Sequence, residues 1–346
     1  MSHSYGATMD GVLLVATDPV FAAHDTGRGH PERAARLEAV EVGIQRSGVV
    51  DALQPLPPRA AERAELERVH PPDHLDALHA LCARGGAVDP DTVVSPGSWK
   101  AAVHAAGAGL AAIDALDRGA GDAAFLALRP PGHHATPSRA MGFCLLNSVA
   151  ISAAALADRG ERVAIVDFDA HHGNGTQACF ERDGRVLYVS FHQWPLYPGT
   201  GRLDEIGHDG GVGTNCNLPF PPGATGDVYL AACDAVVGPL VERFEPTWLL
   251  LSAGFDGHRD DPLTGLSLSA GDFGLLTERL AALVPAGRRI AFLEGGYDLD
   301  ALARSVATTL PALVGARPPH EEAPSAGGPG HVVVDAVADL WSDLGV

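Results

Sequence analysis

The sequence predicts an α/β domain built around a mainly parallel central sheet, and three observations point to it. Six short apolar runs show little polar alternation, as expected of strands that are buried on both faces. Alanine-rich stretches of helical length separate them, and strands that alternate with helices are typical of a parallel sheet. The chain of 346 residues is 46% hydrophobic, which provides enough apolar side chains for a large core.

The predicted elements follow one another along the chain. The strands lie in GVLLVAT (11–17), AAFLAL (123–128), RVAIVDFD (162–169), RVLYVSFH (185–192), TWLLLSAGFD (247–256) and RRIAFLEGGYD (288–298). The helices cover 99–118, 147–159, 227–244 and 269–284. Residues 316–330 are rich in Pro, Gly and Glu, as in a linker, and 331–346 are predicted to form a helix. We therefore predict one domain over 1–315 and a tail over 316–346 that packs on the same domain.

Composition narrows the choice of partners and compartment. The formal net charge of −19 is spread without a long run of either sign, which disfavours nucleic acid and mildly favours cationic ligands. The five cysteines form no CxxC pair, as is usual in a reducing compartment. The sequence shows no signal peptide and no run of about 18 apolar residues. It predicts a soluble, cytoplasmic protein without a membrane partner, and leaves the oligomeric state, including a homo-oligomer, open.

Titratable side chains gather where four of the predicted strands end. In chain order they are His133 and His134, then Asp167, Asp169 and His171, then Asp256, and last Tyr297. In open α/β sheets, ligands bind outside the carboxyl ends of the strands, where the loops converge. These side chains are therefore the candidate functional residues.

The segment VAIVDFDAHHG predicts a metal site. Successive side chains of an extended chain alternate between faces, so Asp167, Asp169 and His171 point the same way. Neighbouring carboxylates repel each other unless a cation compensates. Asp and His ligands suit zinc, with Asp256 as the third ligand, although iron(II) or another first-row metal is not excluded. For any single Asp, the alternative is a helix cap or a turn residue.

The histidine pair and the tyrosine predict acid–base chemistry beside that metal. Paired histidines whose protonation is set by carboxylates serve as general base and general acid. The phenol of Tyr297, presented on a glycine turn, is a donor to a developing oxyanion. Taken separately, His133 and His134 could equally belong to a surface loop, and Tyr297 could be structural.

Taken together, seven segments resemble the zinc-dependent histone deacetylase and acetylpolyamine amidohydrolase family, as a class II-like bacterial member. The segments are HPERAARLEAV (30–40), RPPGHHA (129–135), GFCLLNSVAI (142–151), DFDAHHGNGTQ (167–177), VSFHQWPLYPGTG (189–201), SAGFDGHRDDPLTG (252–265) and LEGGYD (293–298). They span most of the chain in the family's order. The resemblance implies a single-domain arginase/deacetylase-like three-layer α/β fold.

The resemblance also implies a role for each candidate residue. It assigns zinc to Asp169, His171 and Asp256, and leaves His172, which lies on the other parity, out of the metal shell. It makes His133 and His134 the tandem pair that flanks the metal-bound water, with Asp167 behind His133. Asn174 stands behind His134 where some members have Asp, so we expect His134 to be easier to deprotonate than in those members.

Further residues are assigned to the substrate and to a second ion. Tyr297 matches the phenol that polarises the substrate carbonyl. Phe143 and Tyr197 match the aromatic walls of a narrow acyl-lysine tunnel, and Gly142 permits close approach of the chain. A structural potassium ion is expected on the Asp167 side chain, on Ser190, and on the backbone carbonyls of Asp169, His171 and Phe191.

The predicted activity is removal of an acetyl or other acyl group from an N-acetyl-lysine-like amine, with release of acetate. Leu263 occupies the position where polyamine-selective members carry an acidic residue, which favours acetyl-lysine over acetylpolyamines. Asp260 adds charge near the rim, and Asp89 or Asp91 could bind the substrate backbone. The alternatives are a deacetylase of acetylpolyamines or other small N-acyl amines, a non-catalytic acyl-lysine-binding protein, and a binuclear manganese ureohydrolase of the arginase type.

Overall fold

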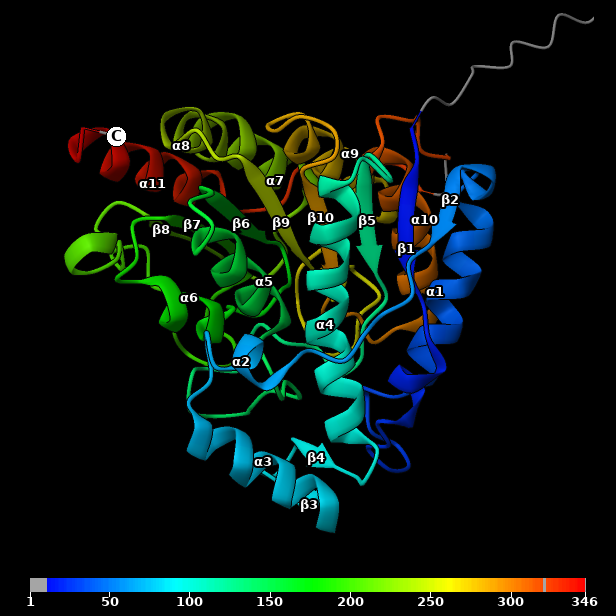
Figure 1. Ribbon diagram of the computed structural model, residues 1–346. Helices are drawn as coiled ribbons and strands as arrows, with labels where there is room; N and C mark the ends of the chain where they lie inside the picture. Colours follow the sequence, from blue (N-terminus) through cyan, green and yellow to red (C-terminus); the bar gives the residue numbers. More distant parts are fainter. Residues whose placement is uncertain (1–10, 320–321, 346) are drawn as a thin grey trace, which may run out of the picture.

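The computed structural model describes residues 11–319 and 322–345, and within them an eight-stranded sheet forms the centre of the molecule (Figure 1). Its strand order is β2-β1-β5-β10-β9-β6-β7-β8, and every neighbouring pair is parallel. The strands are β1 (Leu13–Ala16), β2 (Leu53–Pro55), β5 (Ala123–Leu126), β6 (Val163–Asp167), β7 (Val186–Gln193), β8 (Asn215–Phe220), β9 (Trp248–Ala253) and β10 (Arg289–Leu293). A separate antiparallel pair joins β3 (Gly86–Ala87) to β4 (Val93–Val94).

The parallel α/β prediction is confirmed, and each of the six predicted strands is present in the sheet. The two strands of this sheet that the sequence did not reveal, β2 and β8, are the strands at its two edges; the short β3–β4 pair was not predicted either. Edge strands are hydrogen-bonded on one side only, so they tolerate polar residues and proline. Asn215, Asn217 and Pro219 of β8 break the apolar run by which the inner strands were predicted.

Helices cover both faces of the sheet, which gives three layers. On β6, Val163 and Ile165 join the core that contains α4 (Ser98–Asp117) and α5 (Ser148–Ala157). Ala164 and Val166 join the core on the other face. That face is covered by α1 (Ala35–Arg46), α9 (Ala270–Ala281), α10 (Leu299–Leu313), α7 (Gly226–Ala232) and α8 (Gly238–Phe244). Strand side chains alternate between the faces, so apolar residues at consecutive positions supply both cores.

Three further helices complete the side of the molecule that carries α4. They are α2 (Arg63–Leu66), α3 (Pro72–Arg84) and α6 (Asn174–Phe180). Leu66 of α2, Leu75 of α3 and Phe180 of α6 are buried in the same core as α4 and α5.

The predicted helix over 227–244 is interrupted. A π-helical turn, Cys233–Val237, separates α7 from α8, and Pro239 follows near the start of α8. Proline has no N–H for the regular helical bond and its ring clashes with the preceding turn, so widening that turn lets the helix continue through it.

The chain returns to the sheet after α10. Helix α11 (His331–Asp343) packs against β8 and α7, and its Val334, Val337 and Trp341 side chains are buried. Residues 1–10, 320–321 and 346, which belong to the predicted domain and tail, lie outside the described residues. Among the described helices, none is both long and apolar enough to cross a membrane.

Candidate active site

The candidate residues come from four strands that lie side by side in the middle of the sheet. In the order β5, β10, β9, β6, these strands are followed by His133 and His134, by Tyr297, by Asp256, and by Asp169 with His171. Because the four strands are parallel, their carboxyl ends meet at one edge of the sheet. Segments that are up to about half the chain apart in sequence are thereby brought to one place (Figure 1).

Asp169, His171 and Asp256 form a compact set of donor atoms. One potential ligand atom from each lies within 4.8 Å of the others. The His171 Nδ1 atom is 2.9 Å from Asp256 Oδ2 and 3.2 Å from Asp169 Oδ1. Both carboxylates are fully buried and are held by the backbone, since Gly295 N–H donates to Asp169 Oδ2 and Ala170 N–H donates to Asp256 Oδ1.

Two glycines make room for these carboxylates. A Cβ atom on Gly254 would lie 2.0 Å from Asp169 Oδ2, and one on Gly295 would lie 2.4 Å from Asp256 Oδ2. Such distances are far below van der Waals contact, so any side chain at either position would displace the carboxylates. The glycines that follow β9 and β10 are therefore part of the site.

The charge of this set fits a divalent cation. Among the described residues, the ion-pair partners of Asp169 and Asp256 are imidazoles and include no lysine or arginine. Burial opposes protonation of His171, but Asp256 and Asp169 raise the pKa of its imidazole to about 10. Two buried carboxylates beside an imidazole match the mixed oxygen and nitrogen ligands of zinc, and such a set also accepts iron(II).

The two neighbouring histidines have different partners. His133 Nδ1 is 3.0 Å from Asp167 Oδ2, whereas His134 Nδ1 is 2.8 Å from the amide oxygen of Asn174. Although burial opposes it, Asp169 and Asp167 raise the pKa of His133 well above its usual value. Burial and the neighbouring His133 lower the pKa of His134. The pair therefore combines an imidazole that holds its proton with one that remains neutral.

Tyr297 lies in the loop after β10 and contacts Phe143 and Arg36. Its ring packs edge-on against Phe143, with ring centroids 5.8 Å apart, and the Arg36 guanidinium carbon lies 5.1 Å from the Tyr297 ring centroid. Burial and the Asp256 charge raise the pKa of the phenol well above its usual value. The hydroxyl is therefore a neutral hydrogen-bond donor.

The predicted tunnel residues contact the histidine pair and Tyr297. The Tyr197 ring is edge-on to His134 with centroids 5.2 Å apart. Gly142 has φ +55°, and a Cβ there would lie 2.5 Å from His134 Cδ2 and 3.0 Å from Tyr197 Cε1. Tyr197 and Leu263 are 40% and 37% exposed, so both side chains reach the surface.

The acidic residues Asp260, Asp89 and Asp91 differ in the hydrogen bonds that they form. Asp260 bonds to Arg304 of α10 at 2.7 Å, so its charge is already partnered. Asp89 Oδ1 accepts the backbone N–H groups of Asp91 and Thr92. The Asp91 carbonyl oxygen lies 2.9 Å from His30 Nε2, and the His30 ring packs on Phe143.

The residues predicted to hold potassium are adjacent. Asp167 and Ser190 are opposite each other in the register of β6 and β7, and Phe191 follows on β7. Within the described part of the chain, no hydrogen-bond donor is found on the carbonyl oxygens of Asp169 and His171. His172 points elsewhere, with its nitrogens 2.8 Å from Thr200 Oγ1 and 2.9 Å from Gln177 Oε1.

Four buried side chains that support the site received no role from the sequence. Glu294 Oε2 accepts the N–H groups of Gly132 and His133, at 2.7 and 3.2 Å, and so fixes the histidine loop. The other three form one cluster, made of Glu32, Arg36 and Arg129. Each lies in a segment that carries the resemblance, but a motif alone does not show which of its residues become buried together.

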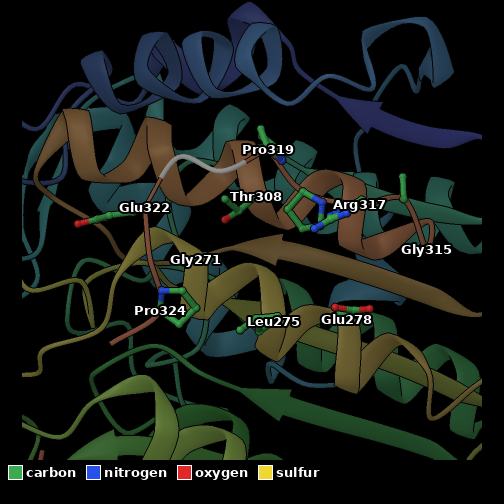
Figure 2. Close-up of a pocket in the computed structure, with 11 residues that line it drawn as sticks. Gly271, Leu275, Glu278, Thr308, Gly315, Arg317, Pro319, Glu322 and Pro324 are labelled. Atoms are coloured by element: carbon green, nitrogen blue, oxygen red, sulfur yellow. The ribbon is translucent and has the colours of Figure 1, made fainter. Parts of the chain in front are cut away.

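A second hollow lies elsewhere in the molecule and holds none of the candidate residues. It has a volume of about 460 Å³ and lies between α9, α10 and the segment after α10. Figure 2 shows Glu278 and Arg317 on its margin, with Thr308 and Glu322 also lining it. Within the part of the chain that the structure describes, no set of converging metal ligands lines it.

Fold and site together define an α/β enzyme whose donor set suits a metal-assisted hydrolysis. A family model for the histone deacetylase domain matches residues 30–313. The chain belongs to the histone deacetylase family, and it is accordingly a deacetylase of the zinc-dependent amidohydrolase class.

Individual relatives agree with this membership. A "Probable deacetylase" of Archaeoglobus fulgidus is 38% identical over 286 residues, covering 81% of this chain and 80% of that protein. A "Histone deacetylase-like amidohydrolase" of Pseudomonas aeruginosa is 40% identical over 275 residues, covering 78% of this chain and 72% of that protein. A solved structure, "Crystal Structure of HDA15 HD domain", has a TM-score of 0.88 at 33% identity, with 96% of this chain and 95% of that chain covered.

Proposed function

We propose that the protein hydrolyses the amide of an N-acetyl-lysine-like side chain to acetate and a free amine. The observation that carries the proposal is the convergence of a neutral phenol, two unlike imidazoles and an Asp/His/Asp donor set behind an aromatic mouth. A protein that only bound acyl-lysine would need no acid, base and oxyanion donor together. An arginase-type site would need a second set of metal ligands around the same centre.

Asp169, His171 and Asp256 would hold the catalytic metal. When bound there, zinc supplies Lewis-acid polarisation of the carbonyl and acidifies water. Zinc is proposed as the native metal, with iron(II) as the alternative. The Asp167 side chain, Ser190, and the carbonyls of Asp169, His171 and Phe191 are proposed to hold potassium, for which the unpartnered carbonyls of Asp169 and His171 are support.

The side chains of His134, His133 and Tyr297 would transfer protons and donate hydrogen bonds during the reaction. His134 is neutral and its Nδ1–H donates to Asn174, so its other nitrogen is free to take a proton from the attacking water. His133, held by Asp167, keeps its proton and would help to protonate the departing amine. The Tyr297 hydroxyl would donate to the carbonyl oxygen as its negative charge develops.

The mouth favours a substrate with an alkyl stem. Phe143 and Tyr197 offer ring faces and edges that an aliphatic chain can contact without hydrogen bonds, and Gly142 keeps the passage open. Leu263 at the rim carries no charge that would select a polyamine. We therefore place acetyl-lysine peptides ahead of acetylpolyamines and other small N-acyl amines.

A cytoplasmic location is part of the proposal. All five cysteines lie in the described part of the chain, where they are free thiols, as is usual in a reducing compartment. The division of the chain at residue 315 into a catalytic domain and a tail stays a prediction, which limited proteolysis would test.

The decisive experiment is Tyr297→Phe assayed on an acetyl-lysine peptide. Turnover is expected to fall by about 10²- to 10³-fold, since one oxyanion donor is lost. Zinc, measured by elemental analysis, should stay near one ion per chain. Turnover close to wild type would refute the proposed role of Tyr297.

A substrate panel decides between the two substrate classes. Wild-type protein is assayed on an acetyl-lysine peptide, acetylputrescine and acetylspermidine, with a hydroxamate inhibitor as the control for metal-dependent turnover. We expect the highest kcat/KM on the peptide. A higher kcat/KM on either acetylpolyamine would favour the alternative.

A further inference from the structure

We propose that Asp261 is a positioning residue for catalysis, because its carboxylate links the backbone of Tyr297 to the rim residue Leu263. This inference depends on the proposed function, in which the Tyr297 hydroxyl contacts the reacting carbonyl. Asp261 lies in the sequence DDPLTG (260–265), two residues before Leu263.

The contacts of Asp261 all go to the backbone of functional segments. Its Oδ2 atom accepts the N–H of Tyr297 at 2.7 Å and that of Asp298 at 3.4 Å. Its Oδ1 atom accepts the N–H of Leu263 at 2.9 Å. One carboxylate therefore connects the loop after β9, which bears Leu263, to the loop after β10, which bears Tyr297.

The position of this carboxylate is itself costly. Asp261 is 6% exposed, and burial together with the Asp256 charge raises the pKa of its carboxyl to about 7. Among the described residues, no lysine or arginine forms an ion pair with Asp261. The guanidinium of Arg304 pairs with the neighbouring Asp260. Buried polar groups are normally hydrogen-bonded, and a buried acid whose bonds all go to the backbone around a reacting group is a candidate for a role in that site.

The remaining contacts of Tyr297 explain why its backbone needs an anchor. Arg36 donates to the carbonyls of Glu294 and Gly296, which precede Tyr297, and its guanidinium lies by the phenol ring. Asp298, which follows, caps α10 through the N–H groups of Asp300 and Ala301. Between these two supports, the Asp261 carboxylate accepts the N–H of Tyr297 itself. That bond fixes the backbone position from which the Tyr297 side chain extends.

The test is Asp261→Asn. The amide has one acceptor oxygen, so either Tyr297 or Leu263 faces an NH₂ group in place of an oxygen. A shift of the phenol by about 1 Å would lower kcat by about 10- to 100-fold. We expect KM on an acetyl-lysine peptide to change much less, and zinc content to remain near one per chain.

A double-mutant cycle separates positioning from a merely structural role. If Asp261 acts through the Tyr297 hydroxyl, Asp261→Asn should lower kcat less than about twofold in a Tyr297→Phe background. A structural role would lower kcat by the same factor in both backgrounds. Each rate is divided by the concentration of sites titrated with a tight-binding hydroxamate, so protein that does not fold is not counted.

Two further variants complete the design. Asp260→Asn changes the neighbouring, half-exposed acid and should leave kcat within about twofold of wild type, as surface substitutions do. Asp261→Glu keeps the charge and both acceptor oxygens, so it should recover part of the lost kcat.

The outcomes distinguish this inference from the proposed function. Normal turnover of Asp261→Asn, or equal losses in both backgrounds, would overturn the positioning role and leave the role of Tyr297 standing. Normal turnover of Tyr297→Phe alone would overturn the role of the phenol, and the positioning role with it.

Discussion

Two buried groups of charges lie at the centre of this protein, and they differ in how the charge is balanced. The balanced cluster is Glu32 with Arg36 and Arg129, and all three side chains are completely buried. Glu32 accepts from both guanidinium groups, at 2.5 to 3.2 Å. The acidic cluster is Asp167, Asp169 and Asp256, whose cationic partners among the described residues are imidazoles alone.

The balanced cluster is satisfied by the chain itself. Each remaining guanidinium bond goes to a backbone carbonyl: Arg36 binds those of Glu294 and Gly296, and Arg129 those of Phe21 and His24. Although burial opposes it, Arg129 and Arg36 lower the pKa of Glu32 to about 2. One formal positive charge remains in excess, and the backbone carbonyls that accept from the two guanidinium groups solvate it, so the Glu32 carboxylate needs no ion from solution.

The acidic cluster is not satisfied in this way. Its carboxylates repel one another, and burial with the Asp169 charge raises the pKa of Asp256. A bound divalent cation would remove this repulsion. The comparison teaches that buried charge alone does not indicate a metal site. The informative feature is charge that the chain leaves uncompensated.

Asp256→Asn tests the acidic cluster and should have the largest effect. Removal of one of three ligands should lower zinc content well below one per chain and reduce turnover by about 10³-fold or more, since the metal contributes several kcal/mol of transition-state stabilisation.

Stability without metal is a second measurement on the same variant. In the presence of chelator, the variant should unfold no more easily than chelated wild type, because a repelling carboxylate is gone. Asp260→Asn is the control. Full zinc content in Asp256→Asn would contradict the ligand assignment.

Glu32→Gln tests the balanced cluster and should act on folding. It leaves two buried guanidinium groups without a counter-charge, which should lower the free energy of unfolding by about 3–5 kcal/mol. Urea unfolding with and without chelator is the measurement, and the loss should be similar in both. Glu38→Gln, at an exposed position of α1, should change stability by less than about 0.5 kcal/mol. A loss that disappeared on chelation would tie this cluster to the metal.

The pH dependence of stability should reveal a histidine that lies beside the balanced cluster. His24 lies 3.5 Å from Glu32, yet burial lowers the pKa of its imidazole from 6.5 to about 4. Between pH 6.5 and 4, the unfolded chain binds a proton there that the folded chain does not. The contribution of His24 to stability is therefore complete above pH 6.5 and falls by about 1.4 kcal/mol per pH unit toward pH 4.

His24→Gln provides the check on this prediction. Between pH 4 and 6.5, the unfolding free energy of the variant should change less steeply with pH than that of wild type. The difference in slope should correspond to at most one proton taken up on unfolding. Identical slopes in the two proteins would mean that His24 is protonated in the folded state.

Asn174→Asp should have the smallest effect, because it adds one more carboxylate behind a single histidine. The new charge, next to His134 Nδ1, should raise the pKa of that imidazole. The acid limb of kcat/KM would then move up by about one pH unit. Asn174→Ala, which adds no charge, should not move the limb upward. An unchanged limb in Asn174→Asp would exclude His134 as the base.

The sequence anticipated the inner strands better than the edges. Strand β6 is apolar from Val163 to Val166 and strand β9 from Trp248 to Leu251, because helices cover both faces of the sheet. Strand β8 carries Asn215 and Asn217, and β2 is three residues long, so neither has the continuous apolar run that predicts a buried strand. The helix over 227–244 was predicted as an alanine-rich stretch of helical length, but the π-helical turn before Pro239 depends on how the chain accommodates that proline.

The sequence by itself determined the chemistry of this protein. Asp169 and His171 lie two residues apart after a buried strand, Asp256 and Tyr297 follow other strands, and the order of these segments matches one family. Residue type and spacing along the chain are local, so they can be read directly.

Only the tertiary structure decided which groups meet. The strand order β5-β10-β9-β6 places Tyr297 beside Phe143 and brings Asp256 to His171. It also buries Glu32 between two arginines and sets Asp261 against the backbone of Tyr297. Residues far apart in the chain reveal neither their mutual distance nor how many of their charges are paired. Those two quantities distinguish the supporting cluster from the candidate metal site.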